Sequence, residues 1–310
     1  MKKTLAVVIG PTASGKTSLS IDLAKALNTY VVSADSRQLY KEIPIGTAAP
    51  TPEELDQVQH YMIAEKSVRE DYSVGDYERD TIRLIENLFE EKSELILCGG
   101  SGLYVKAICE GINEFPEVDP MIRSSVRTLY KEEGLSAISK MLEEKDPDYL
   151  KTVDLQNHQR VLRALEVCLS TGKPFSSFRN KPLPKRNFEV RYIGICPNRE
   201  KLYERINTRV DLMFEAGLLE EAKAVYEFRK HNALQTVGYK EIFAHFDGEL
   251  TLEEAKEAIK QNSRRYAKRQ ITWFKKLKDV LWLQEPDLDK ALEQIKADHP
   301  MHNDISKFLQ

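Results

Sequence analysis

Short apolar runs alternate with helical patterns through the first hundred residues. Three runs, at 5–9, 30–34 and 95–98, are largely apolar, as in strands that are buried on both faces of a sheet. Segments 18–27 and 76–91 carry apolar residues at helical spacing. Strand, helix and strand in this order predict a parallel sheet, whose ligands bind at the carboxyl ends of the strands. The expected fold class is therefore α/β.

The pattern changes after residue 112. A turn-rich, acidic segment at 112–120 precedes largely helical sequence, and a strand returns at 190–196. We predict a core domain made of residues 1–112 and 188–310, with an all-helical subdomain inserted at 113–187. Within the insertion, helices are expected at 120–133, 136–144 and 156–170.

The C-terminal part of the chain is predicted to be mostly helical. The last long helix, 252–277, repeats Ile259, Tyr266 and Trp273 every seven residues, which predicts a stripe that faces the core. The same stripe includes the nearby residues Ile271, Phe274 and Leu277. The other helices are expected at 199–215, 218–228 and 239–246.

The segment between the first strand and the first helix has the phosphate-binding loop pattern, two glycines with four residues between them followed by Lys and Thr. Successive backbone N–H groups and the start of the helix can surround phosphate oxygens, Lys16 can neutralise the terminal phosphate, and Thr17 can hold Mg²⁺. A glycine-rich turn with a chance lysine is disfavoured, because spacing and flanking elements both match. The loop is Gly10, Pro11, Thr12, Ala13, Ser14, Gly15, Lys16 and Thr17.

Two further polar clusters follow predicted strands, at the same edge of the sheet. Asp35-Ser36-Arg37-Gln38 comes after the second strand, and Asp35 is either a functional carboxylate or a Walker B magnesium ligand. Gly99-Gly100-Ser101-Gly102 comes after the third strand, where close approach to a ligand and a simple tight turn are the alternatives. On the first alternative, Ser101 supplies a second hydroxyl near the phosphates.

Charge is distributed unevenly along the chain, although the net charge is only −3. Residues 260–278 contain eight basic residues and no acid before Asp279, and residues 171–187 are also free of acids. We favour a polyanion-binding surface over a solvated face. Four widely separated cysteines indicate neither zinc nor disulfides, and no apolar run is long enough for a membrane span, so a cytoplasmic protein is expected.

Taken together, these motifs resemble those of the bacterial tRNA dimethylallyltransferases, also called tRNA isopentenyltransferases. The resemblance covers nearly the whole chain. The family has a P-loop core with an inserted helical subdomain, and moves a dimethylallyl group from dimethylallyl diphosphate to the N6 amine of the adenine 3′-adjacent to the anticodon, in tRNAs that read codons starting with U. The matching segments are GPTASGKT (10–17), DSRQLY (35–40), IGTAAP (45–50), GGSGLY (99–104), QRVLRALEV (159–167), TGKP (171–174), VGYKE (237–241) and YAKRQITWF (266–274).

The resemblance implies roles for individual residues. The loop at 10–17 would hold the diphosphate with Mg²⁺ on Thr17, Lys16 and Ser101 would stabilise the leaving group, and Asp35 would be the general base. This role makes the Walker B alternative the weaker one. Arg123, in the inserted subdomain, matches a position that touches RNA or diphosphate. The expected tRNA-binding residues are Asp35, Ser36, Arg37, Gln38, Ser101, Arg123, Gln159, Arg160, Val161, Leu162 and Arg163.

Several points remain open from the sequence. Surface salt bridges are the alternative role for the arginines, with Glu166 a partner for Arg163. The chain departs from the family pattern at Ala49, where a lysine is usual, which puts a contact from that loop in doubt. Ser101 replaces a threonine but keeps the hydroxyl. A small-molecule kinase and a non-catalytic RNA-binding P-loop protein are the alternative functions. A monomer that binds the tRNA anticodon stem-loop is expected.

Overall fold

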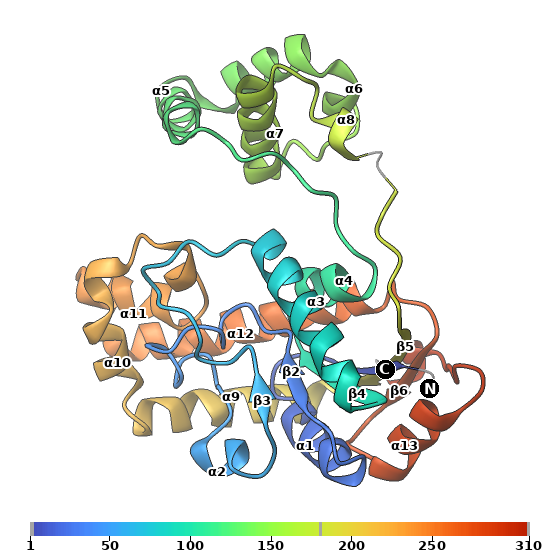
Figure 1. The fold of residues 1–310 in the computed structure, drawn as a ribbon. Helices are drawn as coiled ribbons and strands as arrows, with labels where there is room; N and C mark the ends of the chain where they lie inside the picture. The colour runs from blue at the N-terminus through green and yellow to red at the C-terminus, as the bar shows by residue number, and fades with distance from the viewer. Residues whose placement is uncertain (1–2, 180–181, 309–310) are drawn as a thin grey trace. The chain divides into compact units, whose positions relative to one another are not determined.

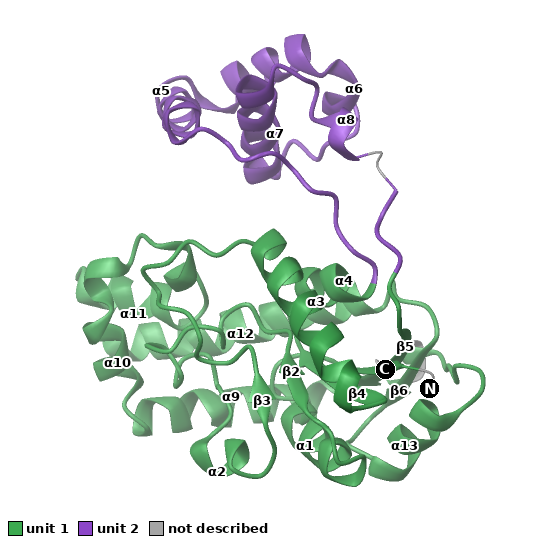
Figure 2. Ribbon diagram, in the orientation of Figure 1, with its two compact units in different colours: residues 1–109, 186–310 green, residues 110–185 purple. Residues whose placement is uncertain are grey.

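The computed structural model describes residues 3–179 and 182–308 and divides into two compact units. Unit 1 is Met1–Cys109 together with Arg186–Gln310, and unit 2 is Glu110–Lys185 (Figure 2). The chain therefore leaves unit 1 after α4, builds unit 2, and returns to unit 1 just before β5.

Unit 1 is built on one parallel sheet of six strands in the order β3-β2-β4-β1-β5-β6 (Figure 1). The sheet confirms the α/β class. The edge strands β3 and β6 are absent from our sequence prediction, because two and four residues are too short to show a pattern. The strands are β1 (Thr4–Ile9), β2 (Val31–Ser33), β3 (His60–Tyr61), β4 (Glu94–Gly99), β5 (Glu189–Ile195) and β6 (Val280–Leu283).

Helices cover both faces of this sheet because its central strand is apolar on both sides. Leu5, Val7 and Ile9 of β1 pack in one cluster with α3 (Val74–Glu91) and α4 (Gly102–Cys109). The alternate residues, Ala6 and Val8, face the cluster that contains α1 (Lys16–Ala26) and α13 (Leu288–Lys296). Side chains of a strand alternate between faces, so one run of six buried residues serves both layers.

A second helical cluster in unit 1 packs around the segment that contains Tyr40 and Ile43. Among its helices, α12 confirms the predicted long helix and most of the predicted stripe. Ile259 and Phe274 are buried and Tyr266, Ile271 and Leu277 are half-buried, whereas Trp273 is 36% exposed. A straight helix drifts about 20° for each heptad, so the third member of a seven-residue repeat lies nearer the edge of the buried face.

The helices of that cluster are α9 (Arg199–Glu215), α10 (Leu218–Ala224), α11 (Tyr239–Phe246) and α12 (Leu252–Phe274). The short elements of unit 1 are α2 (Pro52–Leu55) and the 3₁₀ turns Tyr226–Phe228, Asn232–Leu234 and Ile305–Phe308.

Unit 2 is helical and has its own core. Its longest helix, α5 (Pro120–Lys145), is interrupted at Gly134, whose φ of 75° is open to glycine but strained for other residues. The kink separates the two helices that the sequence predicts there. The other helices are α6 (Pro147–Leu150), α7 (His158–Thr171) and α8 (Ser176–Arg179).

Arg186 anchors the returning chain to unit 1. Its Nε donates to the carbonyl of Ile108 at 2.8 Å, Nη2 donates to the carbonyl of Ala107, and the guanidinium pairs with Glu78. The side chains of Arg186 and Glu78 are only 11% and 13% exposed. The pair therefore satisfies carbonyls in the last turn of α4 while each charge neutralises the other.

We expect Arg186→Ala to lower the free energy of unfolding by about 3 kcal/mol, because it leaves the Glu78 carboxylate buried without its partner. Urea unfolding followed by circular dichroism measures the change. Arg83→Ala removes an exposed arginine from the same helix as Glu78 and is the control. Equal effects of the two substitutions would show that the Arg186–Glu78 pair makes no specific contribution to the free energy of unfolding.

Candidate active site

The glycine-rich loop, Gly10 to Thr17, joins β1 to α1 at the carboxyl edge of the sheet. Gly10 and Gly15 have φ of 152° and 94°, and a Cβ on Gly10 would lie 2.3 Å from the carbonyl oxygen of Ile195. Gly15 is the N-cap of α1, and no side chain caps the helix. The first amides of α1 thus remain available to an anion, as phosphate binding at a helix N-terminus requires.

Lys16 lies within this loop. Its Nζ donates to the carbonyl of Pro11 at 2.6 Å. Burial lowers the pKa of the Lys16 ammonium to about 8, a shift to which the charge of Arg209 also contributes and which Cys98 and Asp35 oppose. A desolvated ammonium in this position interacts strongly with a phosphate, because little water has to be displaced when the anion binds.

Asp35 and Ser101 meet at the ends of β2 and β4. Oδ1 of Asp35 accepts hydrogen bonds from the N–H groups of Arg37 at 2.8 Å and Gln38 at 3.4 Å. Oγ of Ser101 accepts from Ser36 N–H at 2.9 Å and donates to Ser36 Oγ at 3.1 Å. The structure therefore brings Asp35, Ser36 and Ser101 together, with Oδ2 of Asp35 as the oxygen that these bonds leave open.

The glycines before Ser101 serve the protein's own packing. A Cβ on Gly99 would lie 2.1 Å from the carbonyl oxygen of Ala34, and one on Gly100 would lie 2.3 Å from Nε2 of Gln270. The close approach predicted for this segment is thus made to the neighbouring strand end and to α12. The segment is a turn that presents the Ser101 hydroxyl, and its approach to a ligand stays a prediction.

The side chains of Arg37 and Gln38 are engaged with neighbouring loops. Nη1 of Arg37 donates to the carbonyls of Asn232 at 2.7 Å and Ala233 at 3.1 Å. Nε2 of Gln38 donates to the carbonyls of Ala48 at 2.8 Å and Thr47 at 3.3 Å. These two residues therefore fix the loops that surround the site.

Three residues of this site were missed by the sequence reasoning. Gln270, which is buried on α12, accepts from Thr12 N–H at 2.9 Å and donates to the carbonyl of Gly100 at 2.9 Å, so it ties the two loops together. Nη1 of Arg209 lies 3.4 Å from Thr12 Oγ1, and burial lowers the pKa of its guanidinium.

Tyr266 is the third. Burial, with the charge of Asp35 next in size, raises the pKa of the Tyr266 phenol to about 12, and Ser101 opposes the shift. Tyr266 and Gln270 lie within the YAKRQITWF segment, which could have indicated them, whereas Arg209 stands in no recognised motif.

The predicted residues of unit 2 lie mainly on α7. Gln159 and Arg160 are exposed, whereas the side chains of Val161 and Leu162 are buried in the core. The guanidinium of Arg163 lies 3.7 Å from the carboxylate of Glu166, the partner that the sequence suggested. Arg123, on α5, approaches the same carboxylate at 3.9 Å, so one buried acid holds two arginines near each other. The exposed face of unit 2 therefore carries several of the predicted contacts.

The basic run of α12 is partly used within unit 1. Lys260 pairs with Asp211 at 3.0 Å and with Glu257 at 3.1 Å, and Arg264 donates to Asn207. The exposed members of the run are Arg265, Lys268, Arg269, Lys275, Lys276 and Lys278.

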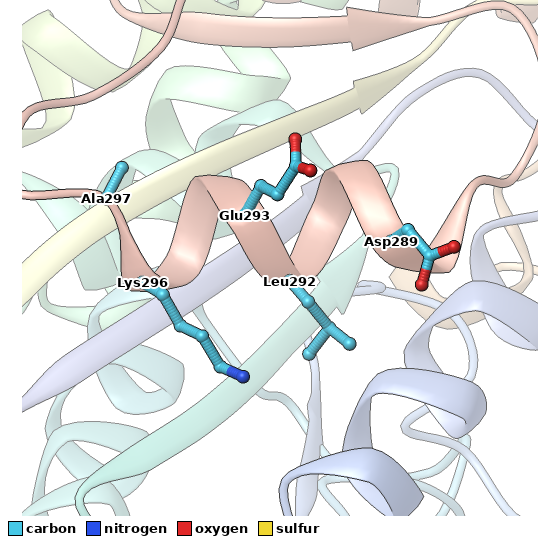
Figure 3. A pocket seen from close by; sticks show the side chains of 5 residues that line it. All are labelled: Asp289, Leu292, Glu293, Lys296 and Ala297. Carbon is cyan, nitrogen blue, oxygen red and sulfur yellow. The ribbon is translucent and has the colours of Figure 1, made fainter.

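The remaining features concern metal ligands, membrane helices and a surface pocket within residues 3–179 and 182–308. No group of three or more His, Cys, Asp or Glu side chains in these ranges is placed to hold a metal ion. No helix in the same ranges is long and apolar enough to cross a membrane. The surface pocket in Figure 3 is lined only by residues on and just after α13, among them Leu292 and Lys296, and by none of the predicted site residues.

Fold and site define a parallel α/β protein with a glycine-rich loop, a lysine and a carboxylate at one sheet edge, and a helical insertion. The model of the IPP transferase family matches residues 38–277. The chain belongs to this family.

Similar proteins are known in sequence and in structure. The tRNA dimethylallyltransferase 2 of Azobacteroides pseudotrichonymphae is 47% identical over 98% of this chain and 99% of its own, and the tRNA dimethylallyltransferase of Christiangramia forsetii is 50% identical over 94% and 97%. The crystal structure of the full-length tRNA isopentenylpyrophosphate transferase of Bacillus halodurans is 39% identical, covers 94% of both chains, and has a TM-score of 0.68. A eukaryotic dimethylallyltransferase acting on tRNA is 27% identical, with a TM-score of 0.76 over 95% of this chain and 77% of that one.

Proposed function

We propose that this protein is a tRNA dimethylallyltransferase, which moves the dimethylallyl group of dimethylallyl diphosphate to the N6 amine of the adenine 3′-adjacent to the anticodon. The observation that carries the proposal is the meeting of an anion-binding loop with Asp35 and Ser101 at one sheet edge. Near-full-length identity of 47–50% to enzymes of that name supports it.

The glycine-rich loop would bind the diphosphate. Amides at the start of α1 face the anion, and Lys16 and Arg209 bring two positive charges to the loop. Thr17, the second residue of α1, offers a hydroxyl for Mg²⁺, whose other ligands would be diphosphate oxygens and water. When bound, Mg²⁺ would neutralise part of the negative charge on the leaving diphosphate.

Asp35 would be the general base. As the allylic C–O bond breaks, negative charge moves to the diphosphate, where Lys16 and the loop amides stabilise it. The N6 lone pair forms the new bond to the allylic carbon, and one N6 proton passes to Oδ2 of Asp35. Because Arg37 and Gln38 N–H hold Oδ1, the carboxylate has a fixed orientation before substrate binds. The products are the N6-alkylated adenine and diphosphate.

The RNA contacts would come from two surfaces. Gln159, Arg160 and Arg163 of unit 2, with Arg123, would bind the anticodon loop, and the exposed basic residues of α12 would bind the phosphate backbone. Taking the target adenine out of its stack costs a few kcal/mol, less in a loop than in a duplex.

Mass spectrometry of the nucleosides of an unmodified tRNA tests the proposal. After incubation with dimethylallyl diphosphate and Mg²⁺, we expect one dimethylallyl group on the adenine beside the anticodon and none when that base is guanine. ATP consumption on a small acceptor, with the tRNA unchanged, would instead indicate a kinase.

The pH dependence of kcat/KM should follow the protonation of the Lys16 side chain. We expect kcat/KM for dimethylallyl diphosphate to fall as pH rises through about 8, by about tenfold for each unit, because the free enzyme loses the Lys16 charge there. Lys16→Arg keeps its charge throughout that range, so its profile should stay flat above pH 8 even if its rate is lower. A profile that declines equally in both proteins would assign the titration to another group.

A further inference from the structure

Glu221, on α10, holds the loop of residues 43–49. Its Oε2 accepts a hydrogen bond from Ile45 N–H at 2.8 Å, and its Oε1 accepts one from Gly46 N–H at 2.8 Å. The phenol of Tyr239, at the start of α11, donates to the same Oε1. This carboxylate accepts hydrogen bonds from two consecutive backbone amides and from a phenol. It therefore holds the loop rigidly, because charge-assisted hydrogen bonds are stronger than those between neutral groups.

The 43–49 loop also packs directly on the Tyr239 ring. A Cβ on Gly46 would lie 2.4 Å from Oη of Tyr239, so the glycine is needed for this contact. Within the loop, Thr47 Oγ1 donates to Ile43 O at 2.8 Å, and Ala49 N–H donates to Pro44 O at 2.9 Å. The loop is therefore a compact turn that two helices hold in place.

This loop in turn fixes the side chain of Gln38. Nε2 of Gln38 donates to the carbonyls of Ala48 and Thr47, which uses both protons of the amide. Its Oε1 is the group that remains to accept a hydrogen bond. Because the N–H of Gln38 also donates to Oδ1 of Asp35, the held amide belongs to the same turn as the proposed base.

We propose that Glu221 and Tyr239 are positioning residues that hold the Gln38 carbonyl for the 6-amino group of the target purine, an inference that rests on the function proposed above. A 6-aminopurine donates hydrogen bonds at position 6, whereas a 6-oxopurine accepts there. A fixed carbonyl therefore favours adenine and disfavours hypoxanthine. An amide free to turn could face either base, so a loosened loop weakens the discrimination.

Kinetics and binding of Glu221→Gln and Tyr239→Phe test this proposal. In both variants we expect KM for tRNA to rise about tenfold, because the Gln38 amide that would contact the RNA is displaced. KM for dimethylallyl diphosphate should stay unchanged, because the glycine-rich loop is not altered. The ratio of Kd values for anticodon stem-loops with hypoxanthine and with adenine at the target position should fall about tenfold. Glu220→Gln removes the same charge from the adjacent, exposed residue and should behave as wild type.

A double-substitution cycle separates positioning from general support of the fold. In a Gln38→Ala background, Glu221→Gln should change the Kd ratio no further. A Kd ratio that stays at the wild-type value in Glu221→Gln, or that falls further in the double variant, would overturn the proposal. A wild-type protein that binds both stem-loops equally would also overturn it, whereas failure of the proposed function would appear as absence of transfer to tRNA.

Discussion

Asp35→Asn should lower kcat for transfer to tRNA by about 10³-fold, because general base catalysis contributes about 10²–10⁴ in rate. Asparagine keeps an oxygen that can accept the N–H groups of Arg37 and Gln38, so the turn should persist. Its amide nitrogen then replaces the oxygen that would take the N6 proton. Single-turnover transfer with saturating substrates measures the chemical step.

Binding of tRNA should change by no more than about threefold in this variant, because the proposed RNA contacts are spread over both units. Asp22→Asn makes the same charge change at an exposed position of α1 and is the control. If transfer and tRNA binding were lost together, Asp35 would be a structural residue. Transfer at the wild-type rate would exclude it as the base.

Lys16→Met should reduce kcat by about 10²–10³-fold, as expected when one charged group that stabilises the leaving oxyanion is removed. Methionine has a similar length and no charge. Because the Lys16 ammonium is desolvated in the protein, its replacement by an apolar side chain should leave the thermal midpoint unchanged or raise it. Loss of activity without loss of stability separates catalysis from folding.

Lys25→Met, in the last turn of the same helix, provides the matched control. Lys25 is exposed and donates a hydrogen bond to Gln57. It lies at the end of α1 opposite the glycine-rich loop. It should keep wild-type kinetics. A Lys16→Met protein with normal kcat and an increased KM for tRNA alone would place Lys16 on the RNA side and contradict its assignment to the diphosphate.

Much of the core could be predicted because its strands are apolar on both faces and end in polar or glycine-rich segments. The β1 run and the loop after it are adjacent in the chain, so spacing alone locates them. The edge strand β3 could not be predicted, because its two residues pair only once the sheet exists. Most of the α12 stripe was predicted correctly, and Trp273 was the exception because a heptad count ignores the drift of a 3.6-residue helix.

The site was harder to predict than the fold, since its contacts join distant segments. Gln270 bonds Thr12 across 258 residues, and no local pattern distinguishes a glutamine that bridges two loops from a glutamine on a helix surface. Glu221 likewise looks like an ordinary acid in α10, although two backbone amides of the 43–49 loop bind it. Local sequence therefore predicted candidate groups for the chemistry, and the structure was needed to find what holds them.

In the proposed reaction, the glycine-rich loop holds a diphosphate that leaves intact while its allylic group passes to RNA. The most direct test uses dimethylallyl diphosphate labelled in both the allyl group and the terminal phosphate, with unmodified tRNA in a single turnover. We expect equal amounts of allyl label in the RNA and of labelled diphosphate in solution, with no label released as monophosphate. Phosphate label transferred to an acceptor, or allyl label that stays out of the tRNA, would contradict it.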